Sequence, residues 1–433
     1  MIEPGATLTL EIEKATAGGR MLARHHGQVV LVWGAIPGER VEARVARAAK
    51  GVVYAEAVGV SSPSPDRRSA SADWRCGGNV FAHVDYTRQL RLKAEIIQDA
   101  FGRIGRLPLA EPPSVMPSPE QGYRMRARLH ARSGRLGFYR EGSHDLCDPA
   151  STRQLLPSTN EWIAQAEIVL QRERLDDVVA VEIAENITGD QRACHVELRS
   201  GGEPIRCAPL SDGLVGLSAS GVDDSRATVV SGTPAIHDDV TVGEQPGAES
   251  LHLRRHVRAF FQGNRFLIGH LVRTVIGSVP REPVIDLYAG GGLLGLALAA
   301  TGVPRVTLVE GDPVSGADLD VNAAAFPGQV SVERRSVESY MATNRAQVAT
   351  VLVDPPRTGM SREALGGVIR AKPQRVVYVS CDVPTLARDA RGLVDAGYQL
   401  ERIAALDLFP NTAHVESVAV FDRSESGSVG RAF

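Results

Sequence analysis

The sequence lacks an apolar run long enough to cross a membrane, because none of its hydrophobic stretches approaches the roughly 20 residues that a spanning helix needs. Its first residues, MIEPGATLTLEIEK, contain acids where a signal peptide has a basic start and an apolar centre. Cysteine is also scarce. The five cysteines are odd in number and scattered, so no disulfide framework is expected; they are Cys76, Cys147, Cys194, Cys207 and Cys381. These absences predict a cytoplasmic protein without a membrane anchor.

A strong excess of charge of either sign is also missing. The formal net charge is -3 at pH 7, which neither favours nor excludes nucleic acid as a partner. The distribution is uneven, however: segment 123–140 contains six arginines and no acid, and segment 251–280 contains five arginines, three histidines and no acid. Such stripes suit phosphate contact, and a solvated surface is the alternative interpretation. We predict that the first stripe binds RNA through Arg124, Arg126, Arg128 and Arg132.

The length and composition indicate a globular protein of two or three domains. The chain has 433 residues, of which 43% are hydrophobic and 23% charged. Residues 1–62 contain short alternating apolar segments separated by Gly18-Gly19, Pro37-Gly38 and Lys50-Gly51, a pattern typical of a small OB-like β-barrel. A Ser/Pro/Arg-rich stretch, SSPSPDRRSASA, follows and is interpreted as a linker.

The remaining chain divides into a mixed region and an α/β region. Residues 70–255 are predicted to form a central α+β RNA-binding region, with an amphipathic helix at QLRLKAEIIQDAFGRI and a basic hairpin at RMRARLHAR and RLGFYR. Within it, segment 211–250 gives no clear element. Residues 256–423 alternate strand-length apolar runs with helical segments, the pattern of a doubly wound parallel sheet. An antiparallel hairpin is expected to end that sheet, followed by a flexible tail at 424–433.

A glycine-rich turn and an acid point to a bound adenosine. The first strand of the α/β region runs into DLYAGGG, residues 286–292, where Gly290 and its neighbours let a ligand approach the backbone. The second strand ends at Glu310, at the spacing of an acid that binds ribose hydroxyls. The fourth strand ends at Asp354 in DPPRTG, which faces the same crevice. This combination does not by itself separate NAD from S-adenosylmethionine.

A cysteine and a carboxylate supply the remaining chemistry. Cys381 follows the fifth strand and precedes a helix whose N-terminus would favour the thiolate, although a buried cysteine can simply be a small apolar residue. The last loop carries His414 and Glu416 back to the same crevice. A thiolate that adds to carbon 6 of uracil makes carbon 5 nucleophilic, and a base must then remove the hydrogen of carbon 5. Cys381 and Glu416 are therefore candidates for these two roles.

At this level of detail the sequence resembles the uracil-5 RNA methyltransferases that act on 23S ribosomal RNA and tRNA. The resemblance spans nearly the whole chain and is strongest in FFQGN, DLYAGGG, LVEGD, VDPPRTG, VSCDVPTLARD and DLFPNTAHVESVAVF. It implies a class I methyltransferase fold and an S-adenosylmethionine site formed by Gln262, Tyr288, Glu310 and Asp354. It also implies that Cys381 is the nucleophile and Glu416 the base. The N-terminal segment is similar to the family's small RNA-binding barrel, and YRMRARLH resembles its central RNA-binding region.

Two departures from the family pattern are visible. Many members have Cys and Asn where this chain has Ala289 and Leu293, within and just after the glycine loop. Many ribosomal members also hold an iron–sulfur cluster with C-x5-C-x2-C and a later cysteine. This chain reads Ala70, Cys76, Gly77, Gly78 and Asn79, with Cys147 in the fourth position. Since a four-iron cluster normally takes four cysteine ligands, we expect no cluster and no other metal.

Three alternatives remain beside a uridine methyltransferase. A cytosine-5 RNA methyltransferase would carry a second cysteine in the fourth-strand loop, which here reads DPPR. A non-catalytic RNA-binding or ribosome-assembly factor would not need Cys381, Asp354 and Glu416. A dehydrogenase would leave the cysteine and the basic stripes unused. The barrel favours 23S rRNA over tRNA, the protein is expected to be a monomer, and the sequence does not identify the nucleotide.

Overall fold

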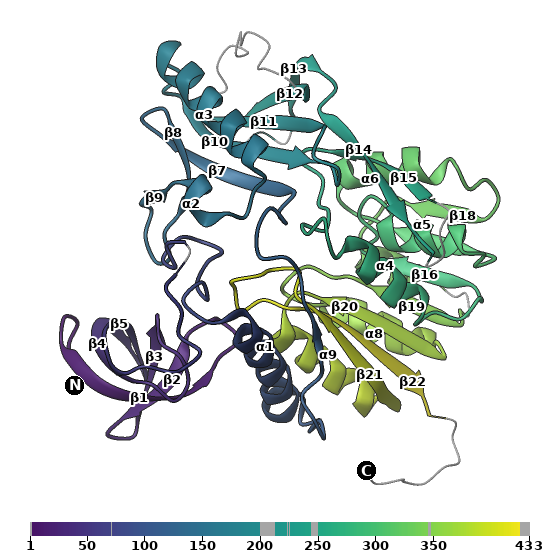
Figure 1. Cartoon of the computed structure of the whole chain (residues 1–433). Helices are drawn as coiled ribbons and strands as arrows, with labels where there is room; N and C mark the ends of the chain where they lie inside the picture. The colour runs from purple at the N-terminus through teal and green to yellow at the C-terminus, as the bar shows by residue number, and fades with distance from the viewer. Residues whose placement is uncertain are drawn as a thin grey trace.

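The computed structural model describes residues 2–70, 72–199, 213–222, 224, 226–243, 250–344 and 348–424. Figure 1 shows a small barrel at the N-terminus, a central sheet with a helix along it, and a larger sheet flanked by helices at the C-terminus. Within the described ranges, no helix is long and apolar enough to span a membrane.

The N-terminal strands form a closed barrel in the order β1-β2-β3-β5-β4, as the sequence predicts. In the first part of β1 every second residue is buried, namely Leu8, Leu10 and Ile12, because a strand that closes on a small core turns alternate side chains inward. The strands are β1 Thr7–Ala15, β2 Met21–His25, β3 Gln28–Trp33, β4 Arg40–Ala49 and β5 Val52–Ser62.

The segment interpreted as a linker is held in place by ion pairs. Arg67 Nε donates to Glu39 of the barrel over 2.6 Å, and Arg68 pairs with Glu120. The chain then enters α1, Tyr86–Ala100, which continues as a π-helical turn, η1 Phe101–Gly105. The predicted amphipathic helix is thereby confirmed. Leu92 of α1 packs in the barrel core, whereas other apolar residues of the helix pack against the C-terminal sheet. Helix α1 therefore connects the barrel with the C-terminal sheet.

The central region is built on a seven-stranded sheet in the order β13-β12-β11-β10-β7-β8-β9. The predicted basic hairpin is its β7–β8 pair. Helix α3, Pro157–Arg172, packs Trp162 and Leu170 into the core of this sheet, and the short α2, Pro149–Thr152, precedes it. The strands are β7 Arg126–Arg132, β8 Arg135–Tyr139, β9 Leu146–Cys147, β10 Val178–Glu185, β11 Arg192–Leu198, β12 Leu214–Gly221 and β13 Thr228–Gly232. Segment 211–250, unassigned from sequence, contributes β12, β13 and β14 and lies in part outside the described residues.

The C-terminal region is a doubly wound sheet in the order β18-β17-β16-β19-β20-β22-β21-β6. Strands β16 to β20 run parallel, and β22 pairs antiparallel with both β20 and β21, which confirms the predicted final hairpin. The two-residue edge strand β6, Val115–Met116, comes from the central region and was not predicted. The other strands are β16 Val284–Leu287, β17 Val306–Val309, β18 Val330–Glu333, β19 Thr350–Val353, β20 Arg375–Ser380, β21 Tyr398–Leu406 and β22 Glu416–Arg423.

Helices cover both faces of this sheet (Figure 1). They are α4 Ile268–Ile276, α5 Leu293–Ala300, α6 Pro313–Ala323, α7 Val337–Thr343, α8 Arg362–Ala371 and α9 Val383–Asp395. A two-stranded ribbon, β14 Ala235–Thr241 and β15 Ser250–His256, leads from the central region into α4. Of the predicted tail, only Ser424 is described, and 425–433 lie outside the described residues.

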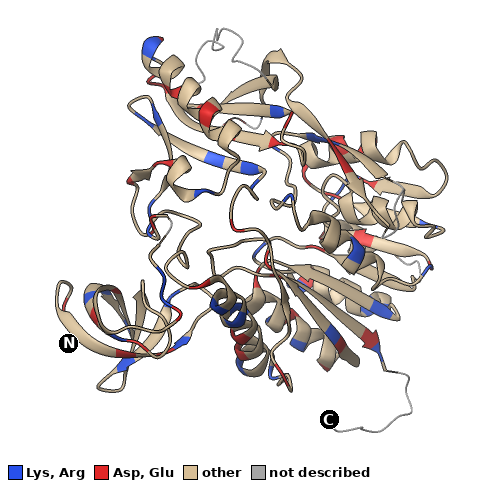
Figure 2. Ribbon diagram, viewed as in Figure 1, with Lys and Arg blue, Asp and Glu red and all other residues tan. Residues whose placement is uncertain are grey.

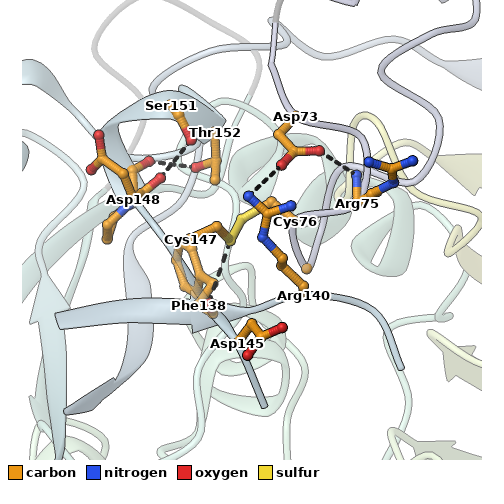
Figure 3. Close-up of a disulfide and its surroundings, with 12 residues drawn as sticks. Asp73, Arg75, Cys76, Phe138, Arg140, Asp145, Cys147, Asp148, Ser151 and Thr152 are labelled. Atoms are coloured by element: carbon orange, nitrogen blue, oxygen red, sulfur yellow. Dashed lines mark hydrogen bonds and ion pairs between the residues drawn. A yellow bond between two sulfur atoms is a disulfide. The ribbon is translucent and has the colours of Figure 1, made fainter. Parts of the chain in front are cut away.

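One prediction about cysteine is wrong. Cys76 and Cys147 form a disulfide across 71 residues of sequence, shown in Figure 3. The loop after the barrel contacts the end of β8, where Gly77 N donates to Tyr139 O over 3.0 Å and Cys76 forms an isolated β-bridge with Arg140. Strand β9, which carries Cys147, pairs with β8 and so lies beside this loop. Residue spacing alone does not predict this pairing, because contact between distant segments is set by the fold, although the family's cluster pattern already places both cysteines at one site.

Candidate active site

The candidate residues gather at one edge of the C-terminal sheet. Strands β16, β17, β19 and β20 are parallel neighbours, so the segments that follow their carboxyl ends lie side by side. Glu310 follows β17, Asp354 follows β19 and Cys381 follows β20. Glu416, the first residue of the antiparallel β22, lies at the same edge because its neighbour Ser417 pairs with Ser380.

The glycine loop after β16 adopts backbone angles that favour glycine. Gly290 has a φ of 57° and Gly292 a φ of 96°, and Tyr288 takes a φ of 65°. Gly290 N donates to Glu310 Oε2 over 2.7 Å, and Asp312 N donates to Glu310 Oε1 over 2.6 Å. These two bonds fix the acid beside the loop. A Cβ at Gly290 would meet no atom within 4 Å, so this backbone is open to a ligand.

Asp286 is a site residue that the sequence motif contained but that was not assigned a role. It is 1% exposed, and neither carboxylate oxygen has a hydrogen-bond partner of ordinary geometry among the described residues. Burial raises its pKa well above the usual range, Asp354 adds to this, and the backbone N–H of Gly295 lowers it in part. An acid within an apolar strand that runs into a glycine loop is the sequence feature that could have identified it.

A narrow pocket connects these residues. It is lined by Gln262, Tyr288, Gly290, Asp286 and Asp354, together with Phe260, Phe261 and Leu293. The residues fit an S-adenosyl ligand. The carboxylate of Asp286 is buried without a hydrogen bond of ordinary geometry among the described residues, the open backbone of Gly290 faces the pocket, and Glu310 is held at the neighbouring strand end. Leu293, one of the two departures in this loop, begins α5 and packs in the core.

A hydrogen bond connects the side chains of Gln262 and Asp354. Gln262 Nε2 donates to Asp354 Oδ2 over 3.1 Å, which joins the segment after β15 to the loop after β19. Burial raises the pKa of Asp354 to about 7, and the bond from Gln262 lowers it in part. This acid can therefore change protonation near neutral pH.

Cys381, Glu416 and Arg357 form the second part of the site. Burial, followed by the charge of Glu416, raises the pKa of Cys381 to about 12, while Arg357 lowers it by charge and by hydrogen bonding. Burial and the charge of Glu416 therefore oppose the stabilisation of the thiolate that is expected from the helix N-terminus. Glu416 is 1% exposed, its two carboxylate oxygens lack partners among the described residues, and burial raises its pKa well above the usual range.

Arg357, within the DPPR motif, is a further functional candidate, whose role the motif alone does not reveal. It is exposed, and its positive charge lowers the pKa of both Cys381 and Glu416. Its charge also lowers the pKa of His414, which burial brings down to about 4. His414 is thus neutral at physiological pH. The centroids of its ring and of the Phe409 ring lie 6.0 Å apart in an edge-to-face arrangement.

Figure 2 shows blue segments along the β7 ribbon, where basic residues lie. The four candidate arginines of the hairpin have different surroundings. Arg124 is partly buried, and its guanidinium donates to Gln154 over 2.6 Å and to the carbonyl of Arg126 over 2.8 Å. Arg126 and Arg128 pair with Glu182 of β10, and Arg128 also pairs with an acid of β11. Arg132 is exposed at the end of β7. Acids from neighbouring strands therefore neutralise part of a stripe that contains no acid of its own.

The structure does not fit a four-iron cluster. Of the four positions at which the family holds thiolates, two are Ala70 and Asn79, and the remaining two are joined as the disulfide Cys76–Cys147. In the described part of the chain, no group of three or more His, Cys, Asp or Glu could hold a metal ion. The absence of a cluster stays a prediction, and the iron and sulfide content of anaerobically purified protein would test it.

Comparisons with known proteins agree with this arrangement. Residues 236–424 match the family model described as tRNA (Uracil-5-)-methyltransferase, and residues 3–58 match the TRAM domain. The chain is 33% identical to the 23S rRNA (uracil(1939)-C(5))-methyltransferase RlmD of Chromohalobacter salexigens, over 96% of this chain and 89% of the relative. It is 30% identical to the protein of the same name from Pseudomonas fluorescens, over 99% of this chain and 94% of the relative.

The same architecture occurs in a solved structure. The crystal structure of the Pyrococcus abyssi tRNA (uracil-54, C5)-methyltransferase in complex with S-adenosyl-L-homocysteine has a TM-score of 0.77 and 24% identity, and the match covers 95% of this chain and 99% of that one. The likeness at this identity concerns the fold.

The doubly wound sheet with a pocket at its strand ends, together with the N-terminal barrel, defines a class I RNA methyltransferase. The chain belongs to the RNA uracil-5 methyltransferase family, whose members use S-adenosylmethionine. The predictions of fold class, enzyme class and cofactor are confirmed.

Proposed function

We propose that this enzyme methylates carbon 5 of a uridine in 23S rRNA through a covalent adduct, with Cys381 as nucleophile and Glu416 as base. The observation that carries the proposal is a partly exposed thiol that lies within electrostatic range of a buried carboxylate, whose oxygens have no hydrogen-bond partner among the described residues. A carboxylate kept free of hydrogen bonds in a protein interior costs stability, and it is retained where a reaction uses it.

The steps assign one task to each group. The thiolate of Cys381 adds to carbon 6 of the ring, and the electron pair moves to an enolate, which makes carbon 5 nucleophilic. When bound, S-adenosylmethionine supplies an electrophilic methyl group. Carbon 5 then carries both the methyl and its original hydrogen. Glu416 accepts that hydrogen as a proton, the C6–S bond breaks, and the thiolate of Cys381 is released.

Both groups must be ionised for this sequence, although burial favours their neutral forms. Arg357 counteracts the effect of burial, because its positive charge lowers the pKa of both Cys381 and Glu416. We propose that Arg357 stabilises the ionised pair, and that Gln262, Tyr288, Gly290, Glu310 and Asp354 hold the cofactor.

One observation supports ribosomal RNA as the substrate. The relatives named for position 1939 of 23S rRNA match over nearly their whole length, at 29% to 33% identity. The cytosine alternative lacks support because the loop after β19 carries no second cysteine, and the non-catalytic alternative leaves the buried Glu416 without a purpose.

Trapping the adduct tests the assigned roles. Cys381→Ala should abolish methyl transfer and form no adduct with a 23S rRNA transcript. Glu416→Gln should methylate the ring and then remain bound to it, giving a complex that survives denaturing electrophoresis and carries labelled methyl. The amide has nearly the shape of the protonated acid, so this variant should fold, and unchanged binding of S-adenosylhomocysteine is the control.

The two variants can also refute the proposal. Methylation by Cys381→Ala, or a folded Glu416→Gln protein that never forms the adduct, would show that the roles are wrong. Mapping 5-methyluridine in rRNA and tRNA from a strain without this gene decides the substrate: loss from 23S rRNA alone is the expected result, and loss from tRNA alone would overturn the choice of ribosomal RNA.

A further inference from the structure

Three polar side chains on one face of α1 form hydrogen bonds with the loop that leads to Glu416. Tyr86, Gln89 and Lys93 follow one another at spacings of three and four residues, so they lie along one side of the helix. Gln89 and Lys93 are 0% exposed, which is unusual for side chains of this polarity. All three bond to the segment 407–411, between β21 and β22.

Lys93 forms a fully buried ion pair with Asp407. Its Nζ donates to Asp407 Oδ1 and, over 2.9 Å, to Phe409 O, and both charged side chains are 0% exposed. Tyr86 OH donates to the second oxygen of Asp407 over 3.0 Å. Burial lowers the pKa of Lys93, and the charge of Asp407 opposes this. A buried pair of this kind is weak evidence for stability, because apolar residues of similar size often serve as well.

Gln89 fixes the next part of the same loop. Its Nε2 donates to Asn411 Oδ1 over 2.9 Å, and Asn411 N donates back to Gln89 Oε1 over 2.9 Å. Asn411 has a φ of 63°, in the left-handed region that residues other than glycine rarely adopt. Phe81 N also donates to Asn411 O over 2.8 Å. The backbone five residues before Glu416 is therefore held in one uncommon conformation by a reciprocal amide pair.

The helix that holds this loop is itself anchored on its other sides. Leu92 and Ile96 pack in the core of the barrel, and Asp99 pairs with Lys14 of β1. Ile97 packs against the catalytic sheet. The chain thus builds a rigid support for a segment whose most evident task is to end at the catalytic carboxylate.

We infer that Gln89 and Lys93 are positioning residues that set Glu416 against the uracil ring through residues 407–411. This inference rests on the proposed function, in which Glu416 removes the hydrogen of carbon 5 after methyl transfer. Displacement of the loop should then slow the loss of that hydrogen more than it slows the addition of Cys381 or the transfer of the methyl. A residue that only stabilised the fold would reduce all steps alike.

The experiment separates those steps with a 23S rRNA transcript that carries tritium at carbon 5 of uridine and a cofactor labelled in its methyl group. Wild-type protein should release one tritium for each methyl incorporated. Gln89→Leu should incorporate methyl with at least a tenfold deficit in tritium release, and the missing fraction should appear as a denaturation-stable adduct. Arg91→Ala, at an exposed position of the same helix, is the matched control and should behave like the wild type.

The ion pair is tested by Lys93→Met combined with Asp407→Leu, which replaces two buried charges by apolar side chains of similar size and leaves no unpaired charge. A tritium deficit in this double variant supports the inference. Equal losses of methyl and tritium in both this protein and Gln89→Leu would overturn it. Glu416→Gln, measured in the same experiment, distinguishes a failure of the positioning role of Gln89 and Lys93 from a failure of the proposed role of Glu416 as base. If that variant shows the deficit and the α1 variants do not, only the positioning role fails; if it shows none, the proposed role of Glu416 fails first.

Discussion

Cys381 should react slowly with iodoacetamide at neutral pH, although it is partly exposed. Free cysteine has a pKa near 8.5, whereas burial and the charge of Glu416 raise the pKa of Cys381 to about 12. At pH 7.5 the thiolate fraction then falls from about a tenth to about 3 in 100,000, a decrease of roughly three-thousandfold. Because the thiolate is the reactive form, the rate should rise about tenfold per pH unit between pH 7 and 10.

Mass spectrometry of the peptide that contains Cys381 would measure this rate over time. Glu416→Gln removes a carboxylate whose charge, once ionised, raises the pKa of the thiol, so the profile should shift to lower pH over the range in which Glu416 is ionised. Arg357→Ala removes a charge that lowers it and should shift the profile to higher pH. Cys194 is wholly buried, so its labelling in the same digests reports opening of the protein rather than the reactivity of the site.

A rate at pH 7.5 close to that of free cysteine would refute the raised pKa, as would a plateau between pH 7 and 9. Either result would mean that the N-terminus of α9, which begins two residues later, outweighs burial and restores the original expectation of a stabilised thiolate. A shift of the same sign in both variants would contradict the opposite electrostatic effects assigned to Glu416 and Arg357.

Other predictions concern binding and stability. Arg132→Ala should reduce the slope of log K against log salt for RNA binding by about one phosphate contact, measured by filter binding, and Arg128→Ala should reduce it less because acids already pair with Arg128. Reduction of the Cys76–Cys147 bond, which closes a long loop, should destabilise the protein by up to about 4 kcal/mol and lower its Tm, whereas a variant with both cysteines replaced by serine should show no response to reductant. Glu310→Ala should weaken binding of S-adenosylhomocysteine by about tenfold to a hundredfold in calorimetry without changing affinity for RNA, and unchanged cofactor affinity would remove Glu310 from the site.

The catalytic sheet and much of its site could be predicted because their signals are local. Each strand is a short apolar run, and each candidate residue lies directly after one, so Glu310, Asp354 and Cys381 could be placed at one edge from sequence order alone. The glycine loop required no knowledge of distant residues either. Asp286 was overlooked because its missing partners become visible only when the surrounding side chains are in place.

The sequence by itself determined the barrel, the doubly wound sheet, the final hairpin and the residue types available for chemistry, since periodicity and turn residues specify these over short distances. Only the tertiary structure decided the quantities that depend on distant neighbours. Lys93 meets Asp407 across 314 positions of sequence, and Arg128 finds its acids on other strands. The pKa of Cys381 also depends on the tertiary structure, because burial and neighbouring charges are properties of the folded environment rather than of the residue.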